Sequence, residues 1–415
     1  MTIFVWFWLA IAITIFLWMM LRRTAAHKEH ALPDLGPRML FQDEQPETVR
    51  EVMEVNLATE HEGVRIFRGR LRESAASVYD KLKGSLSERT VPMVQEDPQS
   101  EAAIILMPKQ VEEAELERPV RPWRHWLLFV LTILTTTFAG AAHQGVNLLE
   151  EPGRFTVGLP YSLGLLAILG VHELGHYFTA RYHGMKVTPP YFIPAPFALG
   201  TFGAFIQMRS PAENRRQLFD VAVAGPLAGL AVAIPALIVG LNSSLVLSAG
   251  HQSGTALGGG GLFDGTSVGS SVLFALLSKI SLGGAVDYGN TLQLSPLAFA
   301  GWLGLLVTAL NLLPIGQLDG GHIARSMFGV RHGELISRIA MWSLFLLALF
   351  VWPGLMLWAI IVFFLAGRGT PPLNDLTTLT PGRRRLGYAA FGILAMILVP
   401  MPQGIWAAGF GCPYL

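Results

Sequence analysis

The sequence predicts a polytopic α-helical membrane protein with about eight spans, a re-entrant non-helical hairpin and a small α+β cytosolic insert. Hydrophobic residues make up 52% of the 415 positions and charged residues only 14%, and the mean hydropathy is +0.46. These charges are too few to cover one large soluble core. Residues 22–125 nevertheless hold 35 of the 59 charged side chains, so one hydrophilic domain is embedded in an otherwise apolar chain.

Composition also excludes several kinds of partner and site. The formal net charge is +1, which provides no basic surface for a nucleic acid. Cys412 is the single cysteine, and this rules out an internal disulfide framework and a cysteine-rich zinc or iron–sulfur site.

The apolar runs divide the chain into four regions. Residues 3–21 are followed by Arg22 and Arg23 and lack a small-x-small cleavage site, so we expect residues 1–22 to be an uncleaved signal-anchor helix. The remaining regions are a cytosolic linker with a small α+β domain (23–124, the domain at about 60–110), a membrane-embedded core (125–370), and a C-terminal linker with the last transmembrane helix (371–415). Within the insert, alternating patterns predict three strands, at 63–71, 90–95 and 101–107, and a helix at 73–86.

Seven further apolar runs approach the length that a bilayer demands. They are residues 126–143, 161–180, 218–241, 296–313, 337–351, 355–366 and 386–402. Trp352, Pro353 and Gly354 separate the fifth run from the sixth, which predicts a tight helical hairpin there.

Three other stretches are neither spans nor simple loops. Residues 187–208 are apolar but contain four prolines, so we expect a non-helical segment that enters the membrane from the cytosolic side and returns. Residues 242–264 are rich in serine and glycine, which is typical of a flexible outer loop. Residues 268–282 form a short apolar segment holding Lys279, and we expect it to lie at the membrane interface.

The distribution of lysine and arginine predicts the orientation. With the N-terminus outside, 28 of the 30 basic residues lie in inner segments, and only Arg154 and Lys279 lie in outer ones. The insert and the active-site side are therefore expected to be cytosolic. Hydrophobic sequence begins at residue 3 without a Ser/Arg-rich transit segment, which favours a bacterial plasma membrane over a plastid.

One apolar run carries the pattern H-E-x-x-H at residues 172–176. Positions i and i+4 share one helical face, so His172 and His176 can bind the same metal ion. Glu173 is offset and can reach a water molecule beside the metal as a general base. All three are costly to place inside a membrane, which favours a functional site. The alternative is a pair of core histidines bonded to backbone carbonyls, with Glu173 as their partner.

A catalytic zinc site needs a third protein ligand. Thr179 and Tyr182 stand where a soluble metzincin has glycine and histidine, so that class is excluded. Glu213 is suitable by type, but it lies beside Arg215 and Arg216 in an aqueous loop. Asp319 is the better candidate, because the helix begun by Ser295 and Pro296 should break at Pro314 and bring Asp319 to the same depth as the histidines.

Each later polar residue has an alternative interpretation. Asp319 can be a turn residue before two glycines. Asn311 can form an interhelical hydrogen bond. For His322, one residue beyond the glycines, a surface position is favoured.

The two motifs together resemble the signature of the site-2 protease family of intramembrane zinc metalloproteases. More narrowly, the chain resembles the plant and bacterial branch named for ethylene-dependent gravitropism-deficient, yellow-green proteins. The similar pieces are H-E-x-x-H, N-x-x-P-x-x-x-L-D-G at 311–320, and the stretches 69–72, 200–204 and 220–229. Arg70 stands where that branch has asparagine.

The resemblance implies hydrolysis of a peptide bond in or near a substrate's transmembrane segment, within the lipid bilayer. It implies one zinc ion per chain bound by His172, His176 and Asp319, with Glu173 as the general base. Asn311 would help to hold the substrate carbonyl or its oxyanion. The insert can have a partner of its own that the sequence does not identify.

The competing hypothesis is a non-proteolytic membrane protein, either a metal transporter or an inactive protease-like scaffold. Transporters often contain repeated halves, and the sequence has no second copy of residues 172–176. An inactive relative would normally lack Glu173 or one of the ligands, and all four residues are present.

Overall fold

The structure, a computed structural model, describes residues 38–41, 44–61, 63–86, 90–97, 101–108, 121–196, 199–247, 271–283, 291–350, 356–365 and 371–399. The predicted first span, most of the predicted outer loop at 242–264, and the turn at 352–354 lie outside the described residues. The chain divides into two compact units. One contains residues 1–108 and 341–367, and the other contains residues 109–340 and 368–415.

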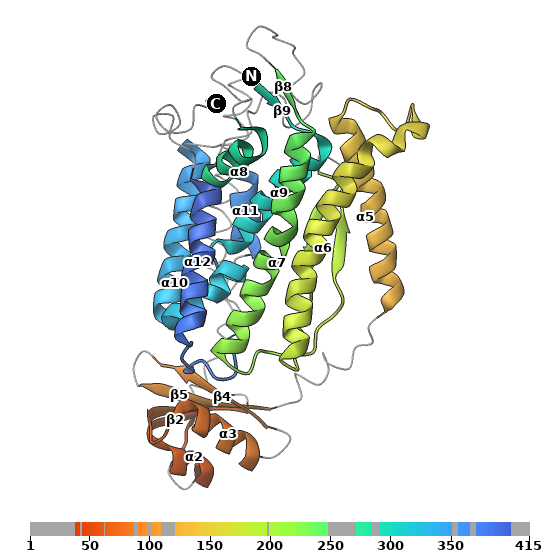
Figure 1. Ribbon diagram of the computed structural model, residues 1–415. Helices are drawn as coiled ribbons and strands as arrows, with labels where there is room; N and C mark the ends of the chain where they lie inside the picture. The colour runs from red at the N-terminus through yellow and green to blue at the C-terminus, as the bar shows by residue number, and fades with distance from the viewer. Residues whose placement is uncertain are drawn as a thin grey trace. The chain divides into compact units, whose positions relative to one another are not determined.

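The hydrophilic insert forms an antiparallel five-stranded sheet in the order β1-β2-β3-β5-β4 (Figure 1). Its strands are β1 (Arg38–Met39), β2 (Met53–His61), β3 (Val64–Leu71), β4 (Thr90–Glu96) and β5 (Ala102–Pro108). Helices α2 (Glu47–Val52) and α3 (Ala75–Ser85) accompany it. Phe67, Val78, Leu82 and Ile104 are fully buried, so apolar faces of the sheet and of α3 supply the core.

The sequence predicted β3, β4, β5 and α3 and missed the rest of this domain. Ser74 caps α3 by accepting a hydrogen bond from the Ser77 N–H, which places the helix start two residues after the predicted one. β2 was missed although Met53, Val55 and Leu57 alternate with the polar residues Glu54 and Asn56, as in a half-buried strand. It is specified by pairing with β3 along almost its whole length, including Met53 opposite Leu71.

The second unit is a bundle of apolar helices. Its members are α5 (Pro122–His143), α6 (Leu159–Tyr182), α7 (Arg215–Asn242), α8 (Val272–Leu282), α9 (Pro296–Leu312) and α12 (Pro381–Leu398). α6 lies between α5 and α7, and α9 packs against both α6 and α7 (Figure 1). Each helix coincides with a segment that the sequence predicted to be apolar and helical or interfacial. Four helices of the described chain are long and apolar enough to cross a membrane: α5, α6 with the 3₁₀ turn before it, α7 and α10.

Helix α10 (Asp319–Phe350) is not continuous, because Gly329 has φ 82° and ψ 179°. A residue without a Cβ is required for this left-handed backbone. Beyond the break the chain folds back on itself. A Cβ at Gly333 would lie 3.0 Å from the Arg325 Cα, and the Gly316 N–H donates to the Ser337 Oγ at 2.9 Å. The first part of α10 is therefore a separate helix of about three turns.

The proline-rich segment forms a hairpin of β6 (Tyr191–Pro194) and β7 (Thr201–Phe205), which confirms that it is not helical. β6 packs against α5, where His125 Nδ1 lies 3.1 Å from the Pro190 carbonyl oxygen. Near the hairpin tip, Gly200 (φ +77°) comes so close to α5 that a Cβ would lie 2.5 Å from the Thr136 Cα. The Thr135 hydroxyl donates to the Gly200 carbonyl at 2.6 Å. The hairpin is thus fixed to α5 through its β6 side and its tip.

Candidate metal centre

Small residues allow α6 and α7 to approach closely around the H-E-x-x-H motif. A Cβ at Gly175 would lie 2.7 Å from the Ala224 carbonyl oxygen, so the two backbones are nearly in contact. On α7, Gly225 and Gly229 form a G-x-x-x-G pattern, which is typical of closely packed transmembrane helices. A Cβ added at Gly225 would lie 2.0 Å from His176 Nε2, and a Cβ added at Gly229 would lie 3.1 Å from His172 Nδ1. The two glycines therefore make the space that the imidazoles occupy.

A backbone contact orients one of these imidazoles. His176 Nδ1 lies 2.8 Å from the carbonyl oxygen of Val221 on α7. Because a carbonyl oxygen only accepts, Nδ1 carries the proton and Nε2 keeps its lone pair for a metal. His172 and His176 are 3% and 7% exposed, so this pair is held inside the helical bundle.

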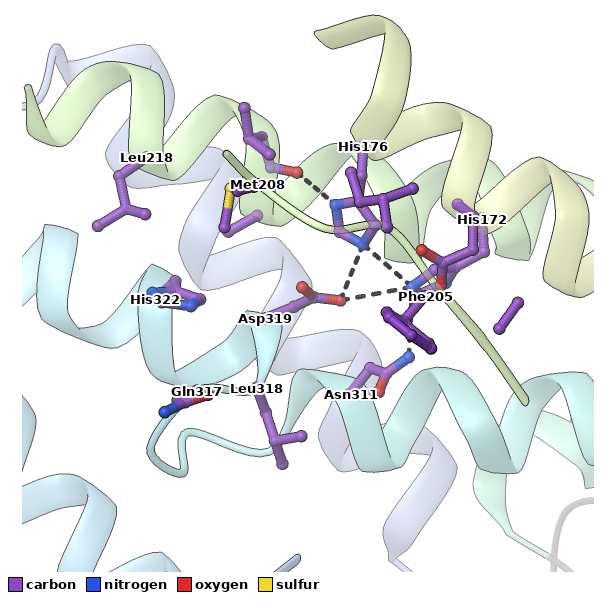
Figure 2. A pocket seen from close by; sticks show the side chains of 15 residues that line it. His172, His176, Phe205, Met208, Leu218, Asn311, Gln317, Leu318, Asp319 and His322 are labelled. Atoms are coloured by element: carbon purple, nitrogen blue, oxygen red, sulfur yellow. Dashed lines mark hydrogen bonds and ion pairs between the residues drawn. The ribbon is translucent and has the colours of Figure 1, made fainter. Parts of the chain in front are cut away.

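Asp319 reaches the histidines from the other side of the site (Figure 2). It is the first residue of α10, and a tight turn connects it to the end of α9, with Leu318 N–H donating to the Ile315 carbonyl at 3.0 Å. Gly320 is required for this approach, since a Cβ there would lie 1.9 Å from the Leu312 carbonyl oxygen. The Asp319 carboxylate points at both imidazoles.

The three donor atoms form a nearly equilateral triangle. His176 Nε2 lies 3.2 Å from His172 Nε2, and Asp319 Oδ2 lies 3.2 Å from His176 Nε2 and 3.4 Å from His172 Nε2. Ligands about 2.0–2.1 Å from a tetrahedral zinc ion are about 3.3 Å apart. Two imidazole nitrogens and one carboxylate oxygen are also a ligand set that catalytic zinc uses. The residues fit a zinc ion with one coordination position left open.

The predicted catalytic residues lie beside this triangle. Glu173 is 7% exposed and lines the same pocket as His172, His176 and Asp319. Asn311, on α9, has its Nδ2 atom 3.2 Å from His172 Nε2. The pocket is completed by Ala204, Phe205, Ile206, Met208, Leu218, Val221, Ala222, Gln317, Leu318 and His322 (Figure 2).

The alternative carboxylate lies elsewhere. Glu213 precedes α7, and its backbone N–H donates to the Gln217 Oε1 in the first turn of that helix. The Gln217 Nε2 lies 3.5 Å from the Glu213 carboxylate. Within the described chain, the group close enough to share a metal ion consists of His172, His176 and Asp319. The carboxylate of Asp319 is directed at the imidazoles rather than serving a turn.

The expected surface position of His322 was wrong. His322 is only 8% exposed and lines the pocket. Because α10 begins at Asp319, His322 is one helical turn further on and shares the face of Asp319. Gly320 and Gly321 disfavour a helix, so the start of α10 at Asp319 was not predicted from the sequence. With that start known, the burial of His322 would have been expected.

The helical bundle and the buried group of His172, His176 and Asp319 define a polytopic, integral membrane protein with a candidate metal site. Residues 160–352 match the family model described as Peptidase family M50, so the chain carries a domain of this family, which contains the site-2 proteases. The resemblance found in the motifs is therefore confirmed.

Curated relatives extend the similarity beyond that domain. The chain is 31% identical over 354 residues to "Probable zinc metalloprotease EGY2, chloroplastic" of Oryza sativa subsp. indica, covering 82% of the chain and 63% of that protein. It is 31% identical over 376 residues to "Probable zinc metalloprotease EGY1, chloroplastic" of Arabidopsis thaliana, covering 82% of the chain and 66% of that protein. The chain thus spans slightly less than two thirds of the length of these relatives. No solved structure matches.

Gly225→Ala should weaken metal binding, because its Cβ would lie only 2.0 Å from His176 Nε2 and the imidazole would have to move. Displacing a ligand's support typically costs about 10–100-fold in metal affinity, and we expect a loss in this range. Zinc affinity of the purified protein, measured by competition with a chelator, checks it.

Gly392→Ala is the matched control, since it also adds a methyl group to an apolar helix but meets no atom within 4 Å. It should leave zinc affinity unchanged. Wild-type affinity in Gly225→Ala would contradict the role of this glycine.

Proposed function

We propose that this chain is an intramembrane zinc metalloprotease that hydrolyses a peptide bond in or near the transmembrane segment of a membrane-protein substrate. The observation that carries the proposal is the triangle of two imidazole nitrogens and one carboxylate oxygen, 3.2–3.4 Å apart, on helices of an apolar bundle. The printed names of the relatives, probable zinc metalloproteases, support the same reaction.

A transmembrane peptide bond resists hydrolysis because its carbonyl is hydrogen-bonded within a helix and water is scarce. His172, His176 and Asp319 would hold the zinc ion. Zinc, when bound, polarises a carbonyl and lowers the pKa of a coordinated water to about 7. The chain's residues must therefore admit and deprotonate water, unfold the substrate helix and stabilise developing charge.

Two residues of the pocket suit these tasks. The Glu173 carboxylate can accept the proton of the attacking water and later deliver it to the leaving amine, as a general base and acid. The Asn311 side-chain amide is a hydrogen-bond donor at the edge of the site, 3.2 Å from His172 Nε2. A donor there can hold the substrate carbonyl and then its oxyanion, a contribution that is commonly about 3–4 kcal/mol.

The hairpin offers a way to open the substrate helix. Since β6 packs on α5, β7 is the strand that leads to the pocket, which Ala204 and Phe205 of β7 help to line. Phe202 and Phe205 are 57% and 47% exposed. A substrate segment added to the edge of β7 would be extended, and its carbonyls would be released from their helical hydrogen bonds. In this proposal the hairpin is re-entrant, entering the bilayer from the cytosolic side.

The basic residues support an arrangement of about eight spans with the N-terminus outside and the insert cytosolic. The bacterial plasma membrane stays a prediction from the sequence, and the relatives' names place those proteins in chloroplasts. A partner for the insert also stays a prediction.

Glu173→Gln and Asp319→Asn should separate chemistry from metal binding. The amide of the first variant cannot accept a proton, so cleavage of a co-expressed single-span substrate should fall by at least about 100-fold while zinc stays bound. The second variant offers a neutral amide oxygen in place of a carboxylate, so zinc content should fall together with cleavage. Immunoblotting of the substrate and metal analysis of the purified protein give the two readings.

Full cleavage by the Glu173→Gln protein would remove the proposed mechanism. Unchanged zinc content in Asp319→Asn would show that another residue completes the ligand set.

A proline scan of β7 at Thr201, Phe202, Ala204 and Phe205 tests strand addition. Gly203 is left out because proline cannot adopt its φ of +104°. Proline removes the N–H that would bond a substrate carbonyl, and one lost backbone hydrogen bond should reduce kcat/KM roughly 2- to 12-fold. The reduction should appear in KM at positions whose N–H faces away from β6, with zinc content retained. Wild-type cleavage at every position would exclude an added substrate strand.

The orientation can be tested with single cysteines in a Cys412→Ser background. Gly153 and Gly382 are both exposed and have no neighbouring atom within 4 Å of an added Cβ, so cysteine fits equally at each. In intact bacterial cells expressing the protein, a membrane-impermeant maleimide should label Gly153→Cys but not Gly382→Cys, which should react only after lysis. The reverse pattern would invert the proposed topology.

A further inference from the structure

Outside the metal centre, a carboxylate in the same unit is completely buried. Asp375 is 0% exposed and lies between two arginines from distant parts of the chain. Arg215 Nε donates to its Oδ1 atom at 2.9 Å, and an Arg325 Nη2 donates to its Oδ2 atom at 2.8 Å. A fully desolvated carboxylate is retained where both its oxygens are satisfied in this way.

The segment around Asp375 is attached firmly to the start of α7. The backbone N–H groups of Leu373 and Asn374 donate to the carbonyls of Ala212 and Glu213 at 2.9 and 2.8 Å. The Arg215 N–H donates to the Thr377 Oγ1 at 3.0 Å. Asp375 is therefore held by the backbone around it, independently of its contact with Arg325.

Arg325 lies on the first part of α10, the part that presents Asp319. This part is bounded by the turn after Leu312 and by the break at Gly329. Because the backbone turns at each end, the direction of this short helix depends on its side contacts. These are the packing of the longer helix at Gly333, where an added Cβ would lie 3.0 Å from the Arg325 Cα, and the ion pair of Arg325 with Asp375. Six residues separate Asp319 from Arg325, or about 9 Å along the helix axis. A contact at Arg325 can therefore affect the orientation of the carboxylate at the other end.

We propose that Asp375 is a positioning residue for the metal centre: through Arg325 it anchors the short helix that carries the third ligand, Asp319. This inference rests on the proposed function and extends it to a residue outside the region 160–352 matched by the family model. The strength of metal binding then depends on an ion pair about two helical turns from the ligand.

The two arginines form a matched pair for a test. Arg325→Gln and Arg215→Gln each remove one partner from the same buried carboxylate and leave the other in place. Only Arg325 shares a helix with Asp319. Both variants should lower the melting temperature, but Arg325→Gln should weaken metal binding about tenfold, whereas Arg215→Gln should change it less than about twofold.

The measurement uses the full-length protein purified in detergent, with Zn²⁺ affinity from chelator competition and the visible spectrum of added Co²⁺ as a report on ligand geometry. Arg325→Lys keeps the charge with a different reach, so it should recover part of the lost affinity. If Arg325→Gln fails to fold, the Zn²⁺ affinity of Arg325→Lys provides the test instead. Wild-type Zn²⁺ affinity and a wild-type Co²⁺ spectrum in the Arg325 variants would overturn the inference. An equal loss of Zn²⁺ affinity in Arg215→Gln would also overturn it, because Asp375 would then stabilise the fold in general.

The outcomes separate this inference from the proposed function. A wild-type protein that binds neither ion would overturn both. A wild-type protein that binds zinc and cleaves substrate, with an Arg325→Gln variant that binds zinc equally well, would overturn the role of Asp375 alone.

Discussion

The contact between α6 and α7 is the constraint on which the metal centre depends. Imidazoles on a membrane helix would ordinarily separate it from its neighbour. Here glycines on α7 leave the space that the rings fill, so His172 and His176 are buried by the same contact that packs the helices. The carbonyl of Val221 then fixes the tautomer of His176. The contact that packs α6 against α7 thus also sets the positions of the two imidazoles. Asp319 then completes a site whose other two members are already in place.

Much of the helical bundle could be predicted from sequence, because apolar runs of membrane length have few alternative structures. The insert was harder. Its strands β3, β4 and β5 were predicted, whereas β2 was not, although its residues alternate between apolar and polar like those of β3. β2 pairs with β3 along almost its whole length. The short helix before Gly329 was also missed, because the apolar run predicted there begins only at residue 337. The sequence contains many glycines, and nothing in it marks Gly329 as the one with a positive φ. That conformation is seen only in the structure, where the chain reverses and brings Gly333 against Arg325.

The proposed ligand set could be predicted from the sequence because each of its members lies in a distinctive local pattern. Two histidines one turn apart indicate a shared helical face, and Asp319 is one of few acidic residues outside the insert. The distances between them depend on the turn after α9, which no periodicity encodes. His322 was misplaced for this reason, since its burial follows from where α10 begins. The buried Asp375 gave no signal, because its arginines are 160 and 50 positions away.

The position of Asp375 has a consequence for where this domain ends. Residues 160–352 define the family match, yet a polypeptide cut there would lack the carboxylate that neutralises Arg215 and Arg325. Each guanidinium would then lose an ion-pair partner in a largely buried position. A fragment that keeps both ion pairs must therefore reach past the segment 373–377, so the family match alone sets the C-terminal limit of this domain too early.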